Sequence, residues 1–478
     1  MGSTPPAMDG KPPPAPPPHV VLVPFPAHGH VAPHVQLGRV LRARGVHVTL
    51  VHTELHHRRR LLARSAGDGA AATDDGGLDV EIIPDGLSID DPPRSLRALH
   101  EALERNCLEP FTALLRDMML RRSPPVSCVV ADTPMPFAAT AARAAGVPDV
   151  QFFTASAAGL MGYLQFPELL ARGVIPLKGN ECKSDGSQLD TPLEWVPGMK
   201  GMRLRDMPTF CHTADAGDWL LHFHVHQMRV AAGAAAVVLN TFVDMERDVV
   251  DALRPLFPPV YTVGPLAAIT SSSPAATGGD DASVMAWLDG KAARSVVYLS
   301  FGSHASMGGA RLREIAAGLA RCGSPYLWVL RPDMAAEVAA AGVGGDGLVV
   351  PWCAQEAVLG HPAVGLFVTH CGWNSILESV AAGVPVLGCP VLSEQTTNCR
   401  QACTAWGVGG GELPEGGGGE EVAAMVREMM RGRKGEEARE KTMEWKRLAE
   451  ASAKEGGSSY DNIGRFVDDV LLKGKRSD

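Results

Sequence analysis

Short apolar segments rich in β-branched residues alternate along this chain with segments of helical spacing, in two successive series. Strands that alternate with helices form parallel sheets covered on both faces. The sequence therefore predicts an α/β protein with two Rossmann-like lobes. The first series predicts strands at 19–25, 46–53, 126–132, 147–154 and 235–242, and the second at 295–303, 324–331, 347–352, 364–370 and 384–390.

Length and composition divide the chain into segments. At 478 residues it exceeds one ordinary domain, and its 45% hydrophobic content supplies sizeable cores. A stretch rich in Ser, Gly, Asp and Pro separates the two series, and the N-terminus is too rich in proline for a helix or a central strand. We expect a disordered tail at 1–18, a first lobe at 19–264, a linker at 265–290, a second lobe at 291–455, and a C-terminal helix at 456–478 that returns to the first lobe.

Charge, cysteine usage and hydropathy exclude several classes of protein. The net charge of −9 argues against nucleic acid or an anionic membrane as the main partner. The ten cysteines form no CxxC pair, which indicates reduced thiols. The N-terminus lacks the charged start and apolar core of a signal peptide, and no segment reaches the roughly 18 apolar residues of a membrane span. We expect a cytoplasmic monomer without stable membrane insertion.

Polar side chains follow four of the predicted strands. His30 follows the first strand, Asp132 ends the third, Thr154 ends the fourth, and Ser303 ends the first strand of the second series. Doubly wound sheets bind their ligands outside the carboxyl ends of the strands. These four residues are therefore candidates for one common site.

The stretch 352–395 contains a strand, a turn and a helix start suited to an anion. The strand ends at His370, and Gly372, Asn374 and Ser375 open the helix. A helix N-terminus exposes unpaired N–H groups and a partial positive charge of about half a unit, and can hold a diphosphate. Asn and Ser also favour ordinary helix caps, so this turn alone leaves both interpretations open.

Two further residues of this stretch suit a nucleoside. Glu378 lies one helical turn after Asn374, where a carboxylate can accept both hydroxyls of a ribose. Trp352 offers a flat face for a base. The stretch as a whole therefore suits a nucleoside diphosphate.

From its Trp to its final Gln, the stretch 352–395 resembles the signature box of the plant family-1 UDP-glycosyltransferases. The resemblance extends from His19 to about Leu471, and the segments 23–33, 151–164, 193–210 and 394–401 are most similar to cyanohydrin glucosyltransferases of cyanogenic-glucoside pathways. It implies a GT-B fold, in which two Rossmann-like domains face each other across a cleft. The first domain would bind the acceptor and the second the UDP-sugar.

The resemblance implies that His30 is a general base and that Asp132 orients it. An alcohol is a poor nucleophile at neutral pH, and an imidazole with a pKa near 6.5 can take its proton during attack. Asp132 would fix the tautomer and stabilise the imidazolium. Displacement of UDP in one step would invert the anomeric centre and give a β-glucoside.

The donor site is also implied by resemblance. The final Gln of the box is usual for glucose users, so UDP-glucose is the expected donor, and preorganised donors around the leaving UDP would make a metal unnecessary. The implied contacts are Trp352, Cys353, Gln355 and Glu378 for uridine, Ser303, His370, Gly372, Asn374 and Ser375 for the diphosphate, and Thr154, Trp373, Glu394 and Gln395 for the sugar.

The acceptor is expected to be a small hydrophobic hydroxylated metabolite. A cyanohydrin similar to p-hydroxymandelonitrile is the first expectation, with monoterpenols, phenolics or flavonoids as alternatives, and transient association with upstream biosynthetic enzymes fits such a pathway. The expected pocket residues are His28, Met135, Phe153, Phe210 and Phe223.

The chain departs from the family pattern at three places. His28 stands where relatives commonly carry Gln, and Glu394 stands where Asp is commoner. The segment 333–350 is shorter than usual and borders the expected donor site.

Other functions are less consistent with the sequence. A nucleotide-dependent oxidoreductase would need GxGxxG after the first strand, which is missing. A UDP-sugar-binding protein without turnover would not need His30 and Asp132. His222, His224 and His226 have no Cys or carboxylate at ligand spacing. For them and for the histidines of 52–57 we expect solvated or pocket-lining side chains and no metal.

Overall fold

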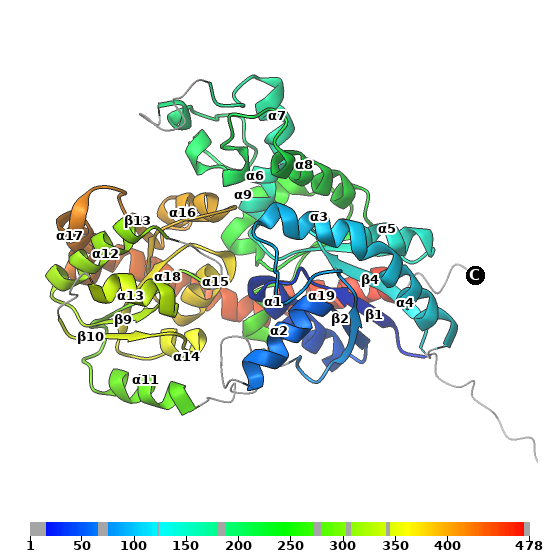
Figure 1. Ribbon diagram of the computed structural model, residues 1–478, viewed down its shortest axis with the longest axis horizontal. Coiled ribbons are helices and arrows are strands. Elements are labelled where there is room, and N and C mark those ends of the chain that lie inside the picture. The colour runs from blue at the N-terminus through cyan, green and yellow to red at the C-terminus, as the bar shows by residue number, and fades with distance from the viewer. Residues whose placement is uncertain are drawn as a thin grey trace, which may run out of the picture.

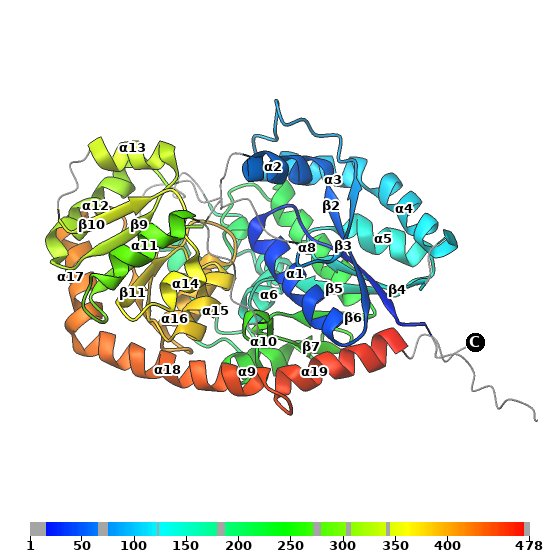
Figure 2. The ribbon, with the colours of Figure 1, turned by 90° about the horizontal axis from the view of Figure 1, so that it is seen from below.

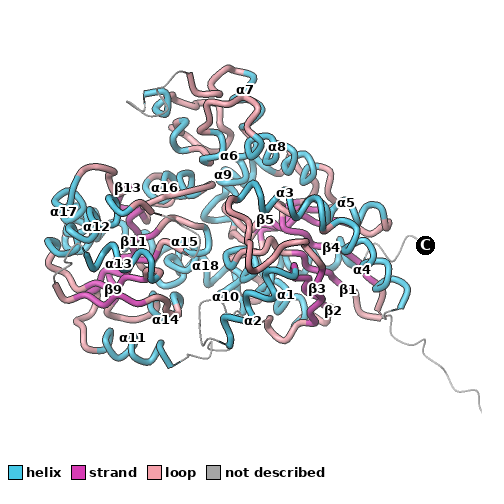
Figure 3. Tube along the Cα trace, in the orientation of Figure 1, coloured by secondary structure: helices cyan, strands magenta, loops and turns pink. Residues whose placement is uncertain are grey.

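The computed structural model describes residues 16–65, 75–121, 124–178, 187–270, 279–302, 307–340 and 345–472, and it contains two α/β lobes (Figure 1). Figure 3 shows the strands as two groups, each enclosed by helices. The predicted site residue Ser303 and part of the shortened segment, 341–344, lie outside the described residues. Within the described part, no helix has the length and apolar character needed to cross a membrane.

The first lobe is built on a seven-stranded sheet in the order β3-β2-β1-β4-β5-β6-β7, and its paired strands are parallel. The five predicted strands are present, and β3 and β7 extend the sheet at its two edges. The strands are β1 (His19–Val23), β2 (His47–Thr53), β3 (Asp79–Ile83), β4 (Val126–Asp132), β5 (Asp149–Phe153), β6 (Ala236–Leu239) and β7 (Val260–Thr262).

The second lobe is built on a six-stranded sheet in the order β10-β9-β8-β11-β12-β13, again with parallel pairs. The five predicted strands are present, and β13 is an additional edge strand. The strands are β8 (Val296–Ser300), β9 (Tyr326–Val329), β10 (Gly347–Val350), β11 (Val364–Thr369), β12 (Val386–Gly388) and β13 (Gly409–Glu412).

Helices cover both faces of each sheet. Those of the first lobe are α1 (His28–Ala43), α2 (Glu54–Ser65), α3 (Leu96–Asn106), α4 (Leu108–Arg121), α5 (Pro136–Ala144), α6 (Ala157–Leu164), α7 (Phe166–Ala171), α8 (Trp219–Ala232) and α9 (Val243–Leu253). Those that follow are α10 (Leu266–Thr270), α11 (Gly279–Asp289), α12 (Gly309–Cys322), α13 (Pro332–Ala340), α14 (Gln355–Leu359), α15 (Trp373–Ala382), α16 (Gln395–Cys403), α17 (Gly418–Arg431), α18 (Arg433–Ala453) and α19 (Ser458–Phe466). The expected linker at 265–290 thus contains α10 and α11.

Alternating side chains of the central strands enter cores on opposite faces of the sheet. In β1, Val20 and Leu22 belong to one buried cluster, and Val21 and Val23 to another. Successive side chains of a strand point to opposite faces, so a strand buried on both sides must be apolar throughout. This explains why β1 reads as a continuous apolar run.

The end of the chain crosses from the second lobe to the first. Figure 2 shows α18 running beneath the second lobe and α19 continuing beneath the first. Ile463 and Phe466 of α19 are buried in the same cluster as β1. Asn462 donates its amide to the Thr262 carbonyl at 2.9 Å, and Ser459 donates its hydroxyl to the Gly264 carbonyl at 2.6 Å. The last helix is therefore part of the structure of the first lobe.

The lobes also share apolar packing. One buried cluster contains Phe153 and Leu160 of the first lobe together with Trp373 and Ile376 of the second. Helix α6 packs against α16 where the lobes meet (Figure 1). The two lobes therefore have a fixed relative position in this structure.

Candidate functional site

The strand order brings three predicted residues of the first lobe together. Strand β1 lies between β2 and β4, so the chain winds in opposite directions from these central strands. In doubly wound sheets, such a switch point forms the ligand crevice at the carboxyl ends. His30 lies in the first turn of α1 after β1, Asp132 ends β4, and Thr154 directly follows β5.

His30 and Asp132 form a hydrogen-bonded pair. The Nδ1 atom of His30 lies 2.8 Å from Oδ2 of Asp132 and 3.0 Å from Oγ1 of Thr154. The Phe25 backbone N–H also donates to Oδ2 of Asp132, at 3.1 Å. The carboxylate is buried, whereas 33% of the His30 side chain is exposed. Because Nδ1 is engaged inside the lobe, Nε2 is the nitrogen left to take a proton from a ligand.

The environment raises the pKa of His30. Burial acts to lower this pKa, but the charge of Asp132 and its hydrogen bond outweigh burial, and Glu394 adds to the increase. The pair therefore favours the imidazolium, which is the form a general base reaches after it has accepted a proton.

Helix α1 begins at His28, before the expected start at 31, and it contains Pro33. Proline has no N–H, so the carbonyl of Gly29, four residues earlier, lacks its usual partner inside the helix. The side chain of Asn374 in the second lobe donates to this carbonyl at 2.8 Å. The predicted diphosphate turn is thus tied to the turn that carries His30.

The second lobe places a helix N-terminus at its own switch point. Strand β8 lies between β9 and β11, and His370 directly follows β11. Gly372 caps α15, and Ile376 is the first residue whose N–H bonds within the helix, to the Gly372 carbonyl. The N–H groups of 373–375 therefore have no partner within the helix and are available to an anion.

Two glycines make room for the imidazole of His370. A Cβ atom at Gly372 would lie 2.4 Å from Nε2 of His370, and one at Gly302 would lie 2.9 Å from it. Burial lowers the pKa of His370 to about 4, although a hydrogen bond with the Ser300 backbone opposes this. His370 is therefore neutral at pH 7 and can donate one hydrogen bond without carrying a charge.

Gln355 and Glu378, both predicted for the ribose, are joined directly. The Gln355 amide donates to Oε2 of Glu378 at 2.6 Å and to Oγ of Ser375 at 3.0 Å. Burial, followed by the charge of Glu356, raises the pKa of Glu378 to about 8. Glu378 is thus largely protonated at neutral pH in the unliganded protein.

Next to the residues predicted for uracil lies one that the sequence did not identify. The Tyr298 hydroxyl in β8 donates to Oε1 of Gln355 at 3.1 Å and lies 3.5 Å from Sγ of Cys353. Cys353 is buried, so its side chain faces the core, and Trp352 is partly exposed. A polar aromatic residue within an aliphatic buried strand is a signal that could have identified Tyr298, because a buried Tyr hydroxyl needs a partner.

The side chains predicted for the sugar already support the surrounding structure. The Trp373 indole N–H donates to the Asn240 carbonyl of the first lobe at 2.7 Å, and the ring is buried. The Gln395 carbonyl oxygen accepts from the backbone N–H groups of Val391 and Leu392 at 2.9 and 3.0 Å. Trp373 could therefore reach a ligand only through its backbone, whereas Gln395 still has its amide donors.

The residues predicted for the acceptor pocket differ in their exposure to solvent. Met135, Phe153, Phe210 and Phe223 are buried, whereas His28 is exposed at the start of α1.

An aromatic cluster leads away from His30, and it includes a histidine that the sequence did not identify. The ring of Phe25 lies 5.2 Å from that of His30 and 4.9 Å from that of His100, which in turn lies 4.4 Å from Phe223. Burial lowers the pKa of His100 to about 3, so it is neutral. Its spacing from Leu96 and Leu103 on α3 places it on the apolar face, and that spacing could have revealed it.

His222 and His224 of α8 have contacts within the first lobe. Among the described residues, no group of three or more His, Cys, Asp or Glu side chains could hold a metal ion. His224 is buried and stacks on Tyr163 and Phe210 at 4.8 and 4.3 Å. His222 is hydrogen-bonded to the Ala216 carbonyl at 2.7 Å. His222 and His226 are exposed, whereas His224 belongs to the aromatic packing of the first lobe.

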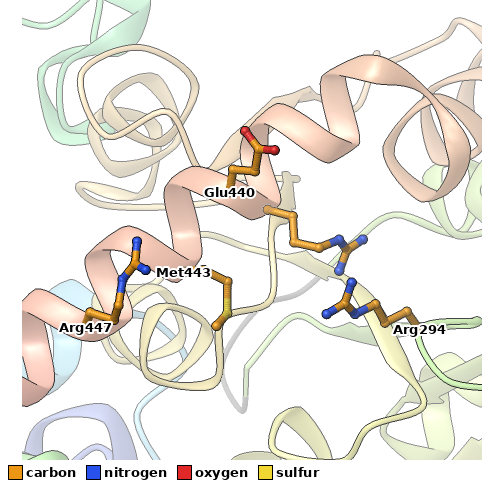
Figure 4. Close-up of a pocket in the computed structure, with 5 residues that line it drawn as sticks. Arg294, Glu440, Met443 and Arg447 are labelled. Carbon is orange, nitrogen blue, oxygen red and sulfur yellow. The ribbon is translucent and has the colours of Figure 1, made fainter.

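A hollow of about 330 Å³ lies on α18, away from these residues. Figure 4 shows Glu440, Met443 and Arg447 along the helix, with Arg294 opposite. None of the predicted site residues lines it.

Comparisons with known proteins agree with this geometry. The family model described as UDP-glucoronosyl and UDP-glucosyl transferase matches residues 47–437. The chain is 41% identical to (R)-mandelonitrile beta-glucosyltransferase of Prunus dulcis, over 95% of this chain and 97% of that protein. It is 39% identical to 7-deoxyloganetin glucosyltransferase of Catharanthus roseus, over 96% and 97%.

Solved structures give the same result. The crystal structure of Os79 from O. sativa in complex with UDP matches with a TM-score of 0.78 and 28% identity, over 94% of this chain and 100% of that one. The two facing Rossmann-like lobes are therefore a GT-B fold. The chain belongs to the UDP-glucoronosyl and UDP-glucosyl transferase family and is a glycosyltransferase enzyme.

Proposed function

We propose that the protein transfers glucose from UDP-glucose to the hydroxyl group of a small specialised metabolite and forms a β-O-glucoside with inversion. The observation that carries this proposal is the buried Asp132 carboxylate, which lies 2.8 Å from Nδ1 of a partly exposed His30. The pair lies at the carboxyl ends of the first sheet, and Asn374, which opens the anion-binding end of α15, is bonded beside it.

The reaction uses His30 as the base. Nε2 of His30 takes the proton of the acceptor hydroxyl while its oxygen attacks the anomeric carbon, and the bond from that carbon to the diphosphate breaks with its electrons leaving on UDP. Asp132 stabilises the imidazolium through Nδ1. General-base assistance of this kind contributes about 10² to 10⁴ in rate.

In this proposal each lobe binds one of the two substrates. Residues 291–455 hold UDP-glucose and residues 19–264 the acceptor. The free N–H groups at the start of α15, with the side chains of Asn374 and Ser375, stabilise the charge that develops on UDP, so the step needs no metal. The uridine lies against Trp352, with its ribose on Gln355 and Glu378.

An aromatic cyanohydrin is the proposed acceptor. The relative named for (R)-mandelonitrile supports this choice, and the rings of Phe25, His100 and Phe223 next to His30 suit an aryl group. Terpenoid alcohols are the second candidate, which the relative named for 7-deoxyloganetin favours.

The test is release of UDP from UDP-glucose in the presence of mandelonitrile, terpenols and flavonols, with the anomer of the product determined by NMR. We expect turnover with at least the cyanohydrin, a β-glucoside, and loss of turnover in His30→Ala while UDP binding survives. Retained turnover in His30→Ala would refute the assignment of the base. Binding of UDP-glucose without turnover on any acceptor would favour a binding protein. The expected cytoplasmic location can be tested with a fluorescent fusion.

A further inference from the structure

Helix α6 of the first lobe packs closely at two glycines, against the second lobe at Gly159 and against Pro208 of its own lobe at Gly162. A Cβ atom at Gly159 would lie 2.7 Å from Cγ of Glu394, and one at Gly162 would lie 2.7 Å from Cδ of Pro208. Gly162 and Tyr163 follow Gly159 by three and four residues, so both lie on the same face of the helix as Gly159. The backbone of α6 therefore lies directly against the side chain of Glu394.

The N-terminus of the same helix is fixed to the second lobe. Ser156 caps α6, and its hydroxyl donates to the side-chain carbonyl of Asn398 at 2.6 Å. The Asn398 amide then donates to the carbonyl of Cys371 in the diphosphate turn, at 3.0 Å. These contacts are buried, so α6 has a defined position relative to the donor residues.

The hydroxyl of Tyr163 reaches the carboxylate of Glu394. It lies 2.6 Å from Oγ of Ser393 and donates to Oε2 of Glu394 at 3.3 Å, and the Ser393 hydroxyl donates to the same oxygen. Burial and the charge of Glu394 raise the pKa of Tyr163 well above 10, so the hydroxyl keeps its proton. Because Ser393 donates its only proton to Glu394, the single Tyr163 proton is shared between Oγ of Ser393 and Oε2 of Glu394, and Tyr163 holds this carboxylate oxygen both directly and through Ser393.

The backbone before Glu394 is also held by the first lobe. Ser393 has a φ of 66°, a left-handed conformation that a residue with a side chain keeps only when its surroundings impose it. The Ser393 N–H donates to Oγ1 of Thr209 at 2.8 Å, and the Thr209 N–H donates to the Ser393 carbonyl at 3.0 Å. Thr209 and Tyr163 thus fix both the backbone and the side chain at this point.

One oxygen of Glu394 is left for a ligand. In the described part of the chain, Oε1 of Glu394 has no hydrogen-bond partner, whereas Oε2 has two. Glutamate has one more rotatable bond than aspartate, so a free side chain would lose more entropy on binding a sugar. The tether to Oε2 removes that freedom before the ligand arrives.

We infer that Tyr163 is a positioning residue that holds the Glu394 carboxylate for a hydroxyl of the donor sugar. Sugar recognition by the second lobe thus depends on a side chain from the acceptor lobe. The ring of Tyr163 stacks on that of His224, at 4.8 Å and 7°, and so links this carboxylate to the aromatic cluster of the acceptor lobe. This inference rests on the proposed function, because it takes the ligand of Glu394 to be the sugar of UDP-glucose.

The test compares UDP-glucose with UDP, which lacks the sugar. In Tyr163→Phe we expect the dissociation constant and KM for UDP-glucose to rise about 5- to 10-fold, the effect of losing one hydrogen bond of ordinary strength. We expect the dissociation constant for UDP to stay unchanged and the preference for UDP-glucose over UDP-galactose to fall. Gly159→Ala, which displaces Glu394 but keeps the hydroxyl, should give the same pattern.

Tyr261→Phe is the matched control. The Tyr261 hydroxyl also donates to a carboxylate, Oδ2 of Asp469, at 3.3 Å, but this pair joins β7 to the C-terminal end of the chain and touches no site residue. The control should bind both ligands like the wild type. In a Glu394→Ala background, Tyr163→Phe should have no further effect.

Two results would overturn the inference: unchanged affinity for UDP-glucose in Tyr163→Phe, or an equal loss for UDP and UDP-glucose, which would indicate a general loosening of the lobes. The binding comparison by calorimetry needs no turnover. A wild-type protein that binds UDP-glucose but transfers nothing would therefore contradict the proposed function and leave the role of Tyr163 measurable.

Discussion

Asn374 of the second lobe donates its side-chain amide to the backbone carbonyl of Gly29, the residue before His30, at 2.8 Å. The bond depends on Pro33, which cannot supply the N–H that this carbonyl would otherwise accept within α1. A residue that interrupts the hydrogen bonding of α1 therefore leaves a carbonyl free for a contact between the turn of the proposed base and the turn proposed to bind the diphosphate.

Pro33→Ala should stabilise the protein and impair the reaction. The new N–H would pair with the Gly29 carbonyl, a gain of up to about 3 kcal/mol that is partly offset by about 1.5 kcal/mol for two lost buried methylenes. We expect the thermal midpoint to rise by about 2–4 °C. Loss of the Asn374 contact should lower kcat/KM about 2- to 10-fold. Thermal melts and initial rates check both effects, and unchanged kcat/KM would show that the contact has no role in the reaction.

The His30–Asp132 pair predicts the acidic limb of the pH–rate profile. The base must be neutral, and Asp132 raises its pKa above 6.5, so kcat/KM should fall as the pH drops through a value above 6.5. Asp132→Asn should move this limb to lower pH and reduce kcat by about 10² to 10⁴. The limb can be followed by initial rates from about pH 5 to 9. An unmoved limb in the variant would assign it to another group.

The His30–Asp132 pair also makes the stability of the fold depend on pH, in the direction opposite to the predicted dependence of kcat/KM. A histidine whose pKa is raised by folding contributes stability below its unfolded pKa, and this contribution is lost as the pH rises through the folded pKa. The pair therefore stabilises the fold most at acidic pH, where kcat/KM is predicted to be lowest.

Glu378 predicts that donor affinity increases at alkaline pH. Its pKa of about 8 leaves it mostly protonated at pH 7, whereas the ribose hydroxyls require an acceptor. If only the carboxylate form binds, the competent fraction rises about tenfold between about pH 7 and 9, and the dissociation constant for UDP should fall by the same factor. Calorimetry in buffers of equal ionic strength measures this. Glu378→Gln should bind more weakly with a flat profile, and a wild-type profile that is equally flat would rule out Glu378 as the titrating group.

The sequence predicted the central strands because burial on both faces requires continuous apolar segments such as β4 and β11. It missed three of the four edge strands, β3, β7 and β13. Strand β13 has the sequence GGGE and no intrinsic preference for a strand, and it forms because β12 offers a free edge. Strand β3 alternates weakly because one side faces solvent. Edge strands depend on their neighbours more than on their own residues.

Site residues were predictable where their position depends only on the end of a strand, as for His30 after β1 and Asp132 at the end of β4. Contacts between distant segments were not. Tyr163 looks like one more aromatic residue of an apolar helix, and its bond to Glu394 arises only because Gly159 lets the two lobes approach. Likewise, the predicted sugar contact at Trp373 did not reveal that its indole joins the lobes through Asn240.

Gly372→Ala should disable the donor site by displacing His370. The added Cβ would lie 2.4 Å from Nε2 of His370, and the ring is only partly exposed, with Gly302 close on another side. Forcing such a ring from its position costs about 1–3 kcal/mol, so we expect UDP binding to weaken about 5- to 150-fold. Gly308→Ala is the control, because Gly308 also caps a helix, α12, with nearly the same φ and ψ, but no atom of the described residues lies within 4 Å of an added Cβ there. Equal losses in both variants would trace the effect to the helix cap, whereas a loss confined to Gly372→Ala assigns it to the imidazole.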